Sequence, residues 1–202
     1  MSSNSLDNYI KLDPQANLWD RVFTVAPLVL IGSRGDDGRT DIAPKHMVTP
    51  IGWGPYFGFV CTPRHATYRN IKRNGTFTVS YPRADQVVLS SLTAAPRCED
   101  DSKPNVEVLD LFEADNENDM FVNGSYLLLE CKKHTMLDGF GEESMIIGEI
   151  TAAYADEAAL RTSESDDNEV IEQSKMLTYL PPGRWAEIKT SYSFPFPSGF
   201  SQ

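Results

Sequence analysis

The chain has 202 residues, of which 41% are hydrophobic and 23% charged, and its formal net charge is −11. This length and balance predict a single globular domain over residues 1–202, with two domains as the alternative that length leaves open, and exclude the disordered class. The negative charge argues against nucleic acid or an anionic membrane as the partner, because recognition of phosphate needs a positive surface.

Strand patterns dominate the first 82 residues. Residues 26–33 (APLVLIGS) have the composition of a buried strand, the Asp-Gly of RGDDGR is a hairpin signal, and residues 40–44 (TDIAP) return as the partner strand. Residues 56–61 (YFGFVC) and 76–82 (TFTVSYP) predict a third and a fourth strand. We therefore expect an antiparallel meander.

Prolines and glycines interrupt the strand-forming residues of the segment 40–61. These are Pro44, Pro50, Gly52, Gly54 and Pro55. Proline cannot donate to a strand ladder and glycine weakens a strand, so the segment either turns a corner or lets a ligand approach its backbone. The residues alone leave both alternatives open.

A short helix is predicted between the third and fourth strands. Thr67 stands at the expected N-cap, residues 68–74 can wind, and Gly75 supplies the C-terminal stop. Free N–H groups, the positive end of the dipole and the neighbouring Arg64 suit a phosphate. The alternative is that Thr67 only caps the helix and that Arg64, with the basic residues after it, is solvated.

The second half continues with helix and strand patterns. Residues 84–95 predict a second helix, and residues 96–118 predict a loop with some helical turns. Residues 121–136 and 144–155 predict two strands that pair antiparallel across a turn at 137–143. The acidic, serine-rich residues 155–177 predict a surface excursion, and residues 183–191 predict a last short strand.

The fold class that these elements predict is mainly β: a β-barrel with short inserted helices, because closure removes exposed strand edges. The tail at 192–200 is rich in aromatic residues and proline. We expect its Phe194, Phe196 and Phe200 to dock on a partner subunit or to cover a pocket.

The cysteines and the first residues indicate the compartment. Cys61, Cys98 and Cys131 are odd in number and have no Cys-x-x-Cys spacing, so we expect free thiols and neither a disulfide nor a zinc site. Cys131 and His134 would point to opposite faces of a strand, so we expect no metal. The sequence shows no apolar run that could span a bilayer and no signal-peptide pattern, so we expect a cytoplasmic protein.

The run of elements over residues 26–80 resembles the flavin reductase-like family, whose FMN-binding domain is a split β-barrel. The Thr-x-x-Asn-Ile of TYRNI at residues 67–71 is the most recognisable piece. LLLECKK, a turn and then MIIGEI are similar to that family's late strand pair, which ends in Ile-Gly-Glu. The resemblance favours the second reading of the segment 40–61, in which prolines and glycines end the ladder and free the backbone for a flavin.

The resemblance implies that FMN lies along the barrel rim and that Arg64, Thr67 and Asn70 hold its phosphate. The predicted cofactor-binding residues are Ala43, Pro44, Lys45, His46, Met47, Val48, Thr62, Arg64, Ala66, Thr67 and Asn70. The family often has a small hydroxyl residue after its Ala-Pro, where this chain has Lys45, His46 and Met47. Lys45 could stabilise the anion of reduced flavin, and His46 could donate to the flavin or assist nicotinamide docking, unless it is simply packed or solvated.

The function implied is that of an NAD(P)H-dependent flavin or FMN reductase, a homodimer, which passes electrons to free flavin or to a partner monooxygenase. FMN is itself the redox group, so no catalytic acid or base is required. One alternative is an FMN-binding electron carrier or storage protein without nicotinamide turnover, and another is a protein-binding barrel with a vestigial site. The lack of a Gly-x-Gly-x-x-Gly sequence does not decide between them, because nicotinamide in this family stacks above the flavin.

Overall fold

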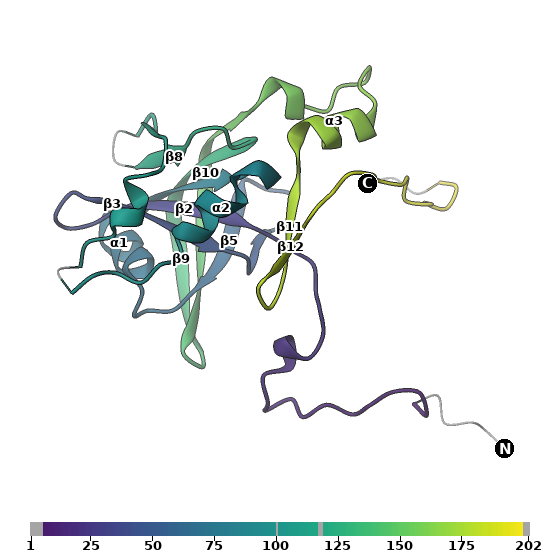
Figure 1. Cartoon of the computed structure of the whole chain (residues 1–202), viewed down its shortest axis with the longest axis horizontal. Helices are drawn as coiled ribbons and strands as arrows, with labels where there is room; N and C mark the ends of the chain where they lie inside the picture. The colour runs from purple at the N-terminus through teal and green to yellow at the C-terminus, as the bar shows by residue number, and fades with distance from the viewer. Residues whose placement is uncertain (1–5, 100, 117–118, 200–202) are drawn as a thin grey trace.

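The structure is a computed structural model that describes residues 6–99, 101–116 and 119–199, and strands dominate it (Figure 1). The strands are β1 (Ala26–Pro27), β2 (Val29–Arg34), β3 (Thr40–Lys45), β4 (Val48–Pro50), β5 (Tyr56–Cys61), β6 (Thr76–Tyr81), β7 (Leu111–Glu113), β8 (Met120–Val122), β9 (Leu127–Phe140), β10 (Glu143–Ala155), β11 (Leu177–Leu180) and β12 (Arg184–Glu187). The α-helices are α1 (Ala66–Asn74), α2 (Val87–Leu92) and α3 (Asp167–Ser174). Short 3-10 turns lie at Leu18–Asp20, Ala84–Gln86, Pro104–Val106 and Glu157–Ala159. The predicted mainly β class with short helices is confirmed.

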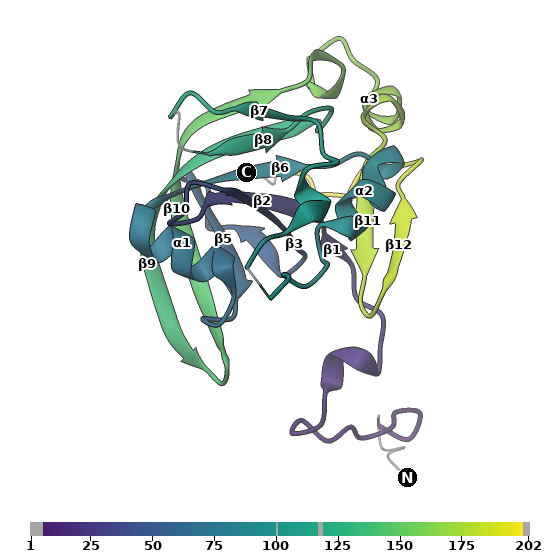
Figure 2. The ribbon, with the colours of Figure 1, turned by 60° about the vertical axis from the view of Figure 1, so that its left-hand side comes forward.

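Seven antiparallel strands form one curled sheet in the order β3-β2-β6-β9-β10-β5-β4 (Figure 2). Its two edge strands, β3 and β4, are separated in the chain only by His46 and Met47. Three Cα steps span at most about 11 Å, so the two edges approach each other at this end of the sheet. The chain itself, and not a hydrogen-bonded ladder, joins the edges there. This arrangement is a split barrel.

The hairpin of β2 and β3 forms as its Asp-Gly turn predicts. Gly38 has a φ of 78°, in the left-handed region that glycine tolerates, and the Gly35 N–H donates to the Arg39 carbonyl at 2.8 Å. The strand predicted over residues 26–33 divides at Leu28. Its first part, β1, leaves the barrel sheet and pairs with β11 in a separate sheet of the order β1-β11-β12.

The proline-rich segment 40–61 forms an edge strand and a tight hairpin. Pro44 lies within β3, and the ladder with β2 continues past it to the pair of Val29 and Lys45, so the expectation that Pro44 ends the ladder is wrong. An edge strand is where a missing N–H group costs least. The loop between β4 and β5 is closed by the Ile51 N–H, which donates to the Tyr56 carbonyl at 2.9 Å, and Gly52 has a φ of 72°.

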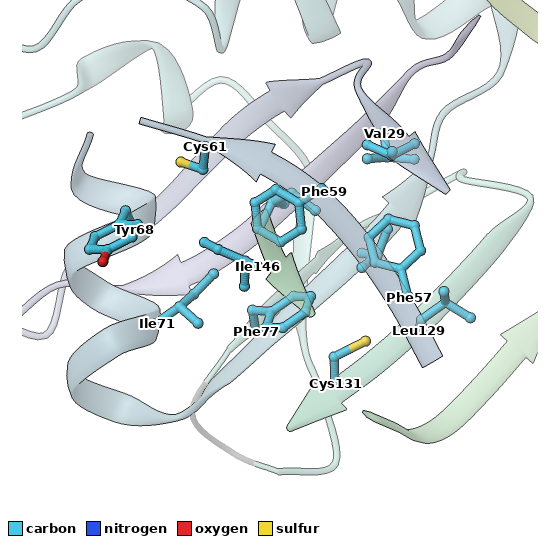
Figure 3. Close-up of a cluster of buried hydrophobic side chains, with 13 residues drawn as sticks. Val29, Phe57, Phe59, Cys61, Tyr68, Ile71, Phe77, Leu129, Cys131 and Ile146 are labelled. Atoms are coloured by element: carbon cyan, nitrogen blue, oxygen red, sulfur yellow. The ribbon is translucent and has the colours of Figure 1, made fainter. Parts of the chain in front are cut away.

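The barrel interior holds the main hydrophobic core (Figure 3). Phe59 and Phe77 meet edge to face with their ring centroids 5.5 Å apart, and α1 closes this core with Tyr68 and Ile71. Burying each such side chain stabilises the fold by about 1.5–3 kcal/mol. A Cβ atom at Gly148 would lie 2.5 Å from the Phe77 ring, so this position of β10 must be glycine.

The second half departs from the predicted boundaries. The pair of β9 and β10 is confirmed, but its register runs to Phe140 opposite Glu143, so the turn expected over residues 137–143 is much shorter and the hairpin longer. The strand expected over 121–136 begins as β8, is broken after Val122 and resumes as β9. β11 was not predicted, and the last strand is limited to β12.

The first and the last described segments, residues 6–25 and 188–199, extend away from the barrel (Figure 1). Phe194 and Phe196 of the tail are exposed and contact each other, with ring centroids 4.7 Å apart. Phe200 lies outside the described residues, so the docking of this tail stays a prediction. Cys61 and Cys131 are buried, Cys98 is exposed, and all three are free. Within the ranges given above, we find no helix long and apolar enough to cross a membrane.

Candidate functional site

A cavity of about 410 Å³ lies where the edge strand β3, the first turn of α1 and the loop 93–103 meet. Six of the eleven predicted cofactor-binding residues line it. They are Ala43, Pro44, Lys45, Arg64, Ala66 and Thr67. The fold therefore brings together residues that stand up to 24 positions apart in the sequence.

The cavity is positive in a chain that is strongly negative. Its lining residues include five cationic side chains and two carboxylates. The cations are Lys45, Arg64, Arg69, Arg97 and Lys103. In a protein with a net charge of −11, such a concentration of positive charge creates a local positive potential, which attracts anions.

Helix α1 begins two residues earlier than predicted. His65 is the N-cap, in an extended conformation and without a side-chain cap hydrogen bond, so the assignment of Thr67 as the N-cap is wrong. The first N–H groups of a helix have no acceptor within it and carry the positive end of its dipole. These groups lie at the cavity, which is lined by His65, Ala66 and Thr67. At the other end, Gly75 takes a left-handed conformation and its N–H donates to the Ile71 carbonyl, as predicted.

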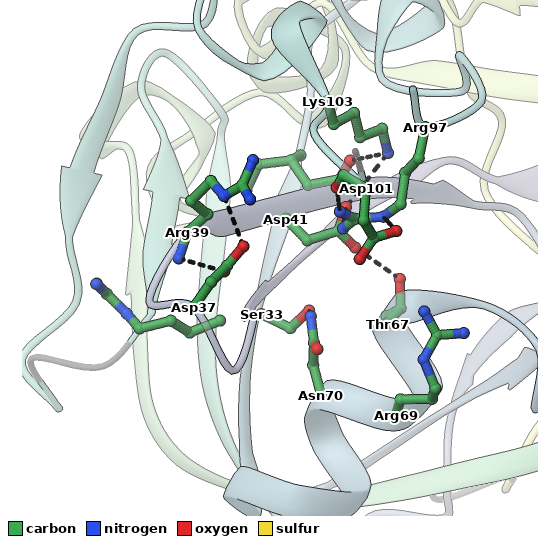
Figure 4. A network of polar contacts seen from close by, with 12 residues as sticks. Ser33, Asp37, Arg39, Asp41, Thr67, Arg69, Asn70, Arg97, Asp101 and Lys103 are labelled. Atoms are coloured by element: carbon green, nitrogen blue, oxygen red, sulfur yellow. Dashed lines mark hydrogen bonds and ion pairs between the residues drawn. The ribbon is translucent and has the colours of Figure 1, made fainter. Parts of the chain in front are cut away.

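The buried Thr67 and Asn70 of the TYRNI sequence fasten α1 to the β2–β3 hairpin (Figure 4). The Thr67 hydroxyl donates to Asp41 Oδ2 at 3.1 Å, and Asn70 Nδ2 donates to Ser33 Oγ at 3.1 Å. Thr67 still lines the cavity, whereas Asn70 lies behind it, toward the β2–β3 turn. Their contact with a phosphate stays a prediction.

Asp41 is the centre of a polar network that the sequence analysis missed (Figure 4). Arg97 Nη2 donates to its Oδ1 at 2.8 Å, and Lys103 Nζ lies 3.5 Å from the same atom. Lys103 Nζ also donates to the carbonyl of Ile42 at 2.8 Å, so it covers part of the free edge of β3. Burial lowers the pKa of Lys103, and the Asp41 carboxylate opposes that shift. The only sign of this network in the sequence is the acidic Asp41 within a strand that is otherwise predicted to be buried.

Arg64 and Thr62 contact the tip of the β9–β10 hairpin. Arg64 Nη1 pairs with Glu142 Oε2 at 2.8 Å, and both side chains are exposed. The Thr62 hydroxyl donates to both carboxylate oxygens of Glu143, at 3.0 and 3.1 Å. Thr62 therefore lines a neighbouring cavity between α1 and the hairpin, and Arg64 lines both cavities.

His46, Met47 and Val48 line a different, apolar cavity of about 410 Å³, next to Trp19 and Pro181. The predicted segment 43–48 is thus divided between two cavities. The His46 ring packs against Tyr179, with centroids 4.8 Å apart. Burial, and then the charge of Lys45, lower the pKa of His46. The imidazole is therefore neutral near pH 7 and can donate one hydrogen bond.

The curled sheet, with a cavity of mainly cationic lining at its rim, defines a split-barrel protein. Comparison with known families assigns it further: residues 22–179 match the family described as flavin reductase like domain. The chain belongs to this family, as its sequence resemblance predicted.

Three solved structures illustrate the likeness. A candidate flavin reductase with a split barrel domain from Shewanella frigidimarina NCIMB 400 is 19% identical, with 94% of this chain and 96% of that chain covered and a TM-score of 0.78. The flavoredoxin of Desulfovibrio vulgaris (Miyazaki F) is 21% identical, with 95% and 100% covered and a TM-score of 0.75. Component B of the nitrilotriacetate monooxygenase from Bacillus cereus is 17% identical, with 92% and 98% covered and a TM-score of 0.78. No curated protein sequence matches the chain.

Proposed function

We propose that this member of the flavin reductase-like family binds FMN in the cavity between β3, α1 and the loop 93–103, and that it is an NAD(P)H-dependent flavin reductase. The observation that carries the proposal is the group of five cationic side chains around the first turn of α1 in a chain of net charge −11. A flavin mononucleotide has one phosphate, which this end of the cavity suits.

The residues present fit the cofactor. We propose that the N–H groups of Ala66 and Thr67, together with Arg64, hold the phosphate, and that residues 43–45 lie along the rest of the molecule. Lys45 lines the same cavity and supplies a positive charge near β3. When bound, FMN supplies the redox chemistry, taking a hydride from reduced nicotinamide and passing electrons on.

The chain's own residues would bind the FMN and orient it. The network of Asp41, Arg97 and Lys103 holds the loop 93–103 over the edge of β3, which keeps one wall of the cavity in place. His46, neutral and packed on Tyr179, is the donor that we propose for the flavin or nicotinamide on the other side of the strand. No proton transfer by a side chain is required.

We further propose a homodimer. Apolar side chains stand exposed on the N-terminal segment and on the tail, among them Trp19, Phe23, Phe194 and Phe196. Such surfaces are usually covered by a partner, and a second copy is the simplest one. Light scattering checks this: we expect twice the mass of the chain, and a monomer at micromolar concentration with FMN bound would contradict it.

The electron acceptor that we propose is free flavin or a monooxygenase partner. Likeness to the Bacillus cereus component B motivates the second choice. The three free thiols suit the reducing cytoplasm, where we place the protein.

The test is anaerobic stopped-flow mixing of the FMN-loaded protein with NADH and, separately, with NADPH. We expect the flavin absorbance to bleach with at least one of them. Arg161→Ala is the matched control for the cavity variant Arg64→Ala, because Arg161 pairs with Asp167 outside the cavity. Bound FMN that neither nucleotide reduces would indicate the alternative, an electron carrier or storage protein. Failure to bind FMN at all would indicate the other alternative, a protein-binding barrel with a vestigial site.

A further inference from the structure

The apolar cavity beside His46 is separate from the proposed flavin cavity, and we call it the His46 cavity. Its volume is about 410 Å³, within the range of about 300–1,000 Å³ that is usual for small-molecule sites. Its walls are mostly apolar and include Trp19, Val25, Val60 and Met145. None of the described residues that line it is an aspartate, glutamate, lysine or arginine. The cavity therefore suits an uncharged ligand, because a charged group would be desolvated there without a counter-charge.

The half-buried His46 ring supplies a hydrogen-bond donor to this cavity. It packs against Tyr179, and burial lowers its pKa, so the imidazole is neutral and carries one N–H. Within the described ranges of the chain, no residue accepts a hydrogen bond from this ring. A ligand in the cavity can therefore accept that hydrogen bond through an oxygen atom.

Trp19 gives the cavity an aromatic wall. Aromatic side chains pack on other rings in offset-stacked or edge-to-face arrangements. Thr49, a further polar residue of the lining, already donates its hydroxyl to the Pro50 carbonyl at 3.0 Å. An aromatic wall, the absence of charge in this lining and a donor at His46 favour a flat, uncharged ring that bears a carbonyl oxygen.

The His46 cavity and the flavin cavity lie on either side of one short run of chain. Lys45 lines the flavin cavity, and His46, the next residue, lines the other. The Cα atoms of two such neighbours are about 3.8 Å apart. A ring held by His46 would therefore lie close to a flavin that runs along residues 43–45.

We propose that the His46 cavity binds a quinone, which accepts electrons from the flavin after the oxidised nicotinamide has left. The inference rests on the proposed function, with FMN in the neighbouring cavity. The quinone takes up two electrons and two protons from the reduced flavin and leaves as the hydroquinone, while the flavin is oxidised. NAD(P)H then supplies a hydride, and water a proton, to reduce the flavin again. His46 donates its hydrogen bond to the quinone carbonyl.

The first experiment measures the binding of duroquinone to the oxidised, FMN-loaded protein by equilibrium dialysis, without turnover. Duroquinone is chosen because its ring is fully methylated and does not add to thiols such as the exposed Cys98. Met145→Glu should weaken duroquinone about tenfold by placing a charge in the cavity, and should change FMN by less than about twofold. Leu160→Glu is the matched control, because Leu160 is 50% exposed and lies outside the cavity, so neither affinity should change.

Val25→Asp is the second variant if Met145→Glu lowers the melting temperature. Val25 lines the cavity but is 76% exposed, so the substitution should leave the fold intact and weaken duroquinone about threefold. His46→Leu tests the donor. It should weaken duroquinone about fivefold by removing one hydrogen bond, while p-xylene, a related ring without carbonyl oxygens, should bind within about twofold of the parent.

The second experiment tests electron transfer. The bound FMN is reduced by light under anaerobic conditions, and duroquinone is then added. We expect the absorbance of oxidised flavin to return, and to return more slowly in Met145→Glu than in Leu160→Glu.

The inference is overturned if the FMN-loaded parent does not bind duroquinone, if Met145→Glu and Val25→Asp bind it as the parent does, or if bound duroquinone leaves the FMN reduced. Binding of duroquinone by a protein that does not bind FMN would instead refute the proposed function, together with the acceptor role that rests on it.

Discussion

Replacement of Arg97 by alanine tests whether the Asp41 network supports the cavity wall. The Asp41 side chain is only 3% exposed and that of Arg97 24%, and their atoms are 2.8 Å apart. After the substitution, the buried Asp41 carboxylate keeps two partners. They are the Thr67 hydroxyl and Lys103, whose Nζ is more distant at 3.5 Å. Loss of one partner of a buried charge pair is costly because the other charge stays desolvated.

The magnitude follows from these contacts. A hydrogen bond to a charged group contributes about 1.5–3 kcal/mol, and breaking a fully buried pair costs about 3–5 kcal/mol. Because Arg97 is partly exposed and two partners of Asp41 remain, we expect a loss of about 2 kcal/mol in the free energy of unfolding. In a chain of this size each kcal/mol shifts the melting temperature by about 2–4 °C, so the variant should melt about 4–8 °C lower.

The assay is thermal and urea unfolding of the parent, Arg97→Ala, Asp41→Asn and the double variant. The two single effects should not add, since both break one interaction. Arg39→Ala is the matched control, because its pair with Asp37 is exposed, at 56% and 39%, and should contribute less than about 1 kcal/mol. If Arg97→Ala costs no more than Arg39→Ala, or if the single effects add, the network does not hold the loop.

Three further predictions concern the ligand, a buried acid and the core. Arg64→Ala should weaken FMN about tenfold while riboflavin, which has no phosphate, binds as before; equal losses in a fluorescence titration would place the phosphate elsewhere. Burial raises the pKa of Asp119, which is 1% exposed, and the neighbouring Thr76 and Asn116 side chains oppose that shift only in part. The folded state therefore binds more protons than the unfolded state, and stability falls as the pH rises from the ordinary value near 3.8 through the raised pKa. Asp119→Asn should then raise the melting temperature at pH 7 and lose this advantage near pH 3, whereas an equal gain at both pH values would refute the assignment. Gly148→Ala should destabilise by about 1–3 kcal/mol, because the new methyl group would lie 2.5 Å from Phe77; an unchanged urea midpoint would contradict this packing.

Elements that depend on local signals could be predicted from the sequence. The β2–β3 hairpin follows from its Asp-Gly turn, and the end of α1 follows from Gly75, the one residue there that accepts a left-handed conformation at no steric cost. The pair of β9 and β10 follows from long apolar runs around a short turn. In each case the determining residues stand next to each other in the chain.

Features that depend on distant contacts could not be predicted. Threonine is a residue type that favours the N-cap position, but the Thr67 hydroxyl donates to Asp41, which lies 26 positions earlier. A cap contributes about 1 kcal/mol and a hydrogen bond to a charged group about 1.5–3 kcal/mol, so the tertiary contact wins. Likewise, Arg97 and Lys103 lie in a segment without periodicity, and only the folded chain shows that they converge on one carboxylate.

The central claim is that the cavity between β3, the start of α1 and the loop 93–103 holds FMN. A crystal structure of the protein grown with FMN tests it most directly. We predict the phosphate within hydrogen-bond distance of the N–H groups of Ala66 and Thr67, with the rest of the molecule along residues 43–45. An FMN molecule whose phosphate lies in the apolar cavity beside His46 and Met47, away from α1, would contradict it.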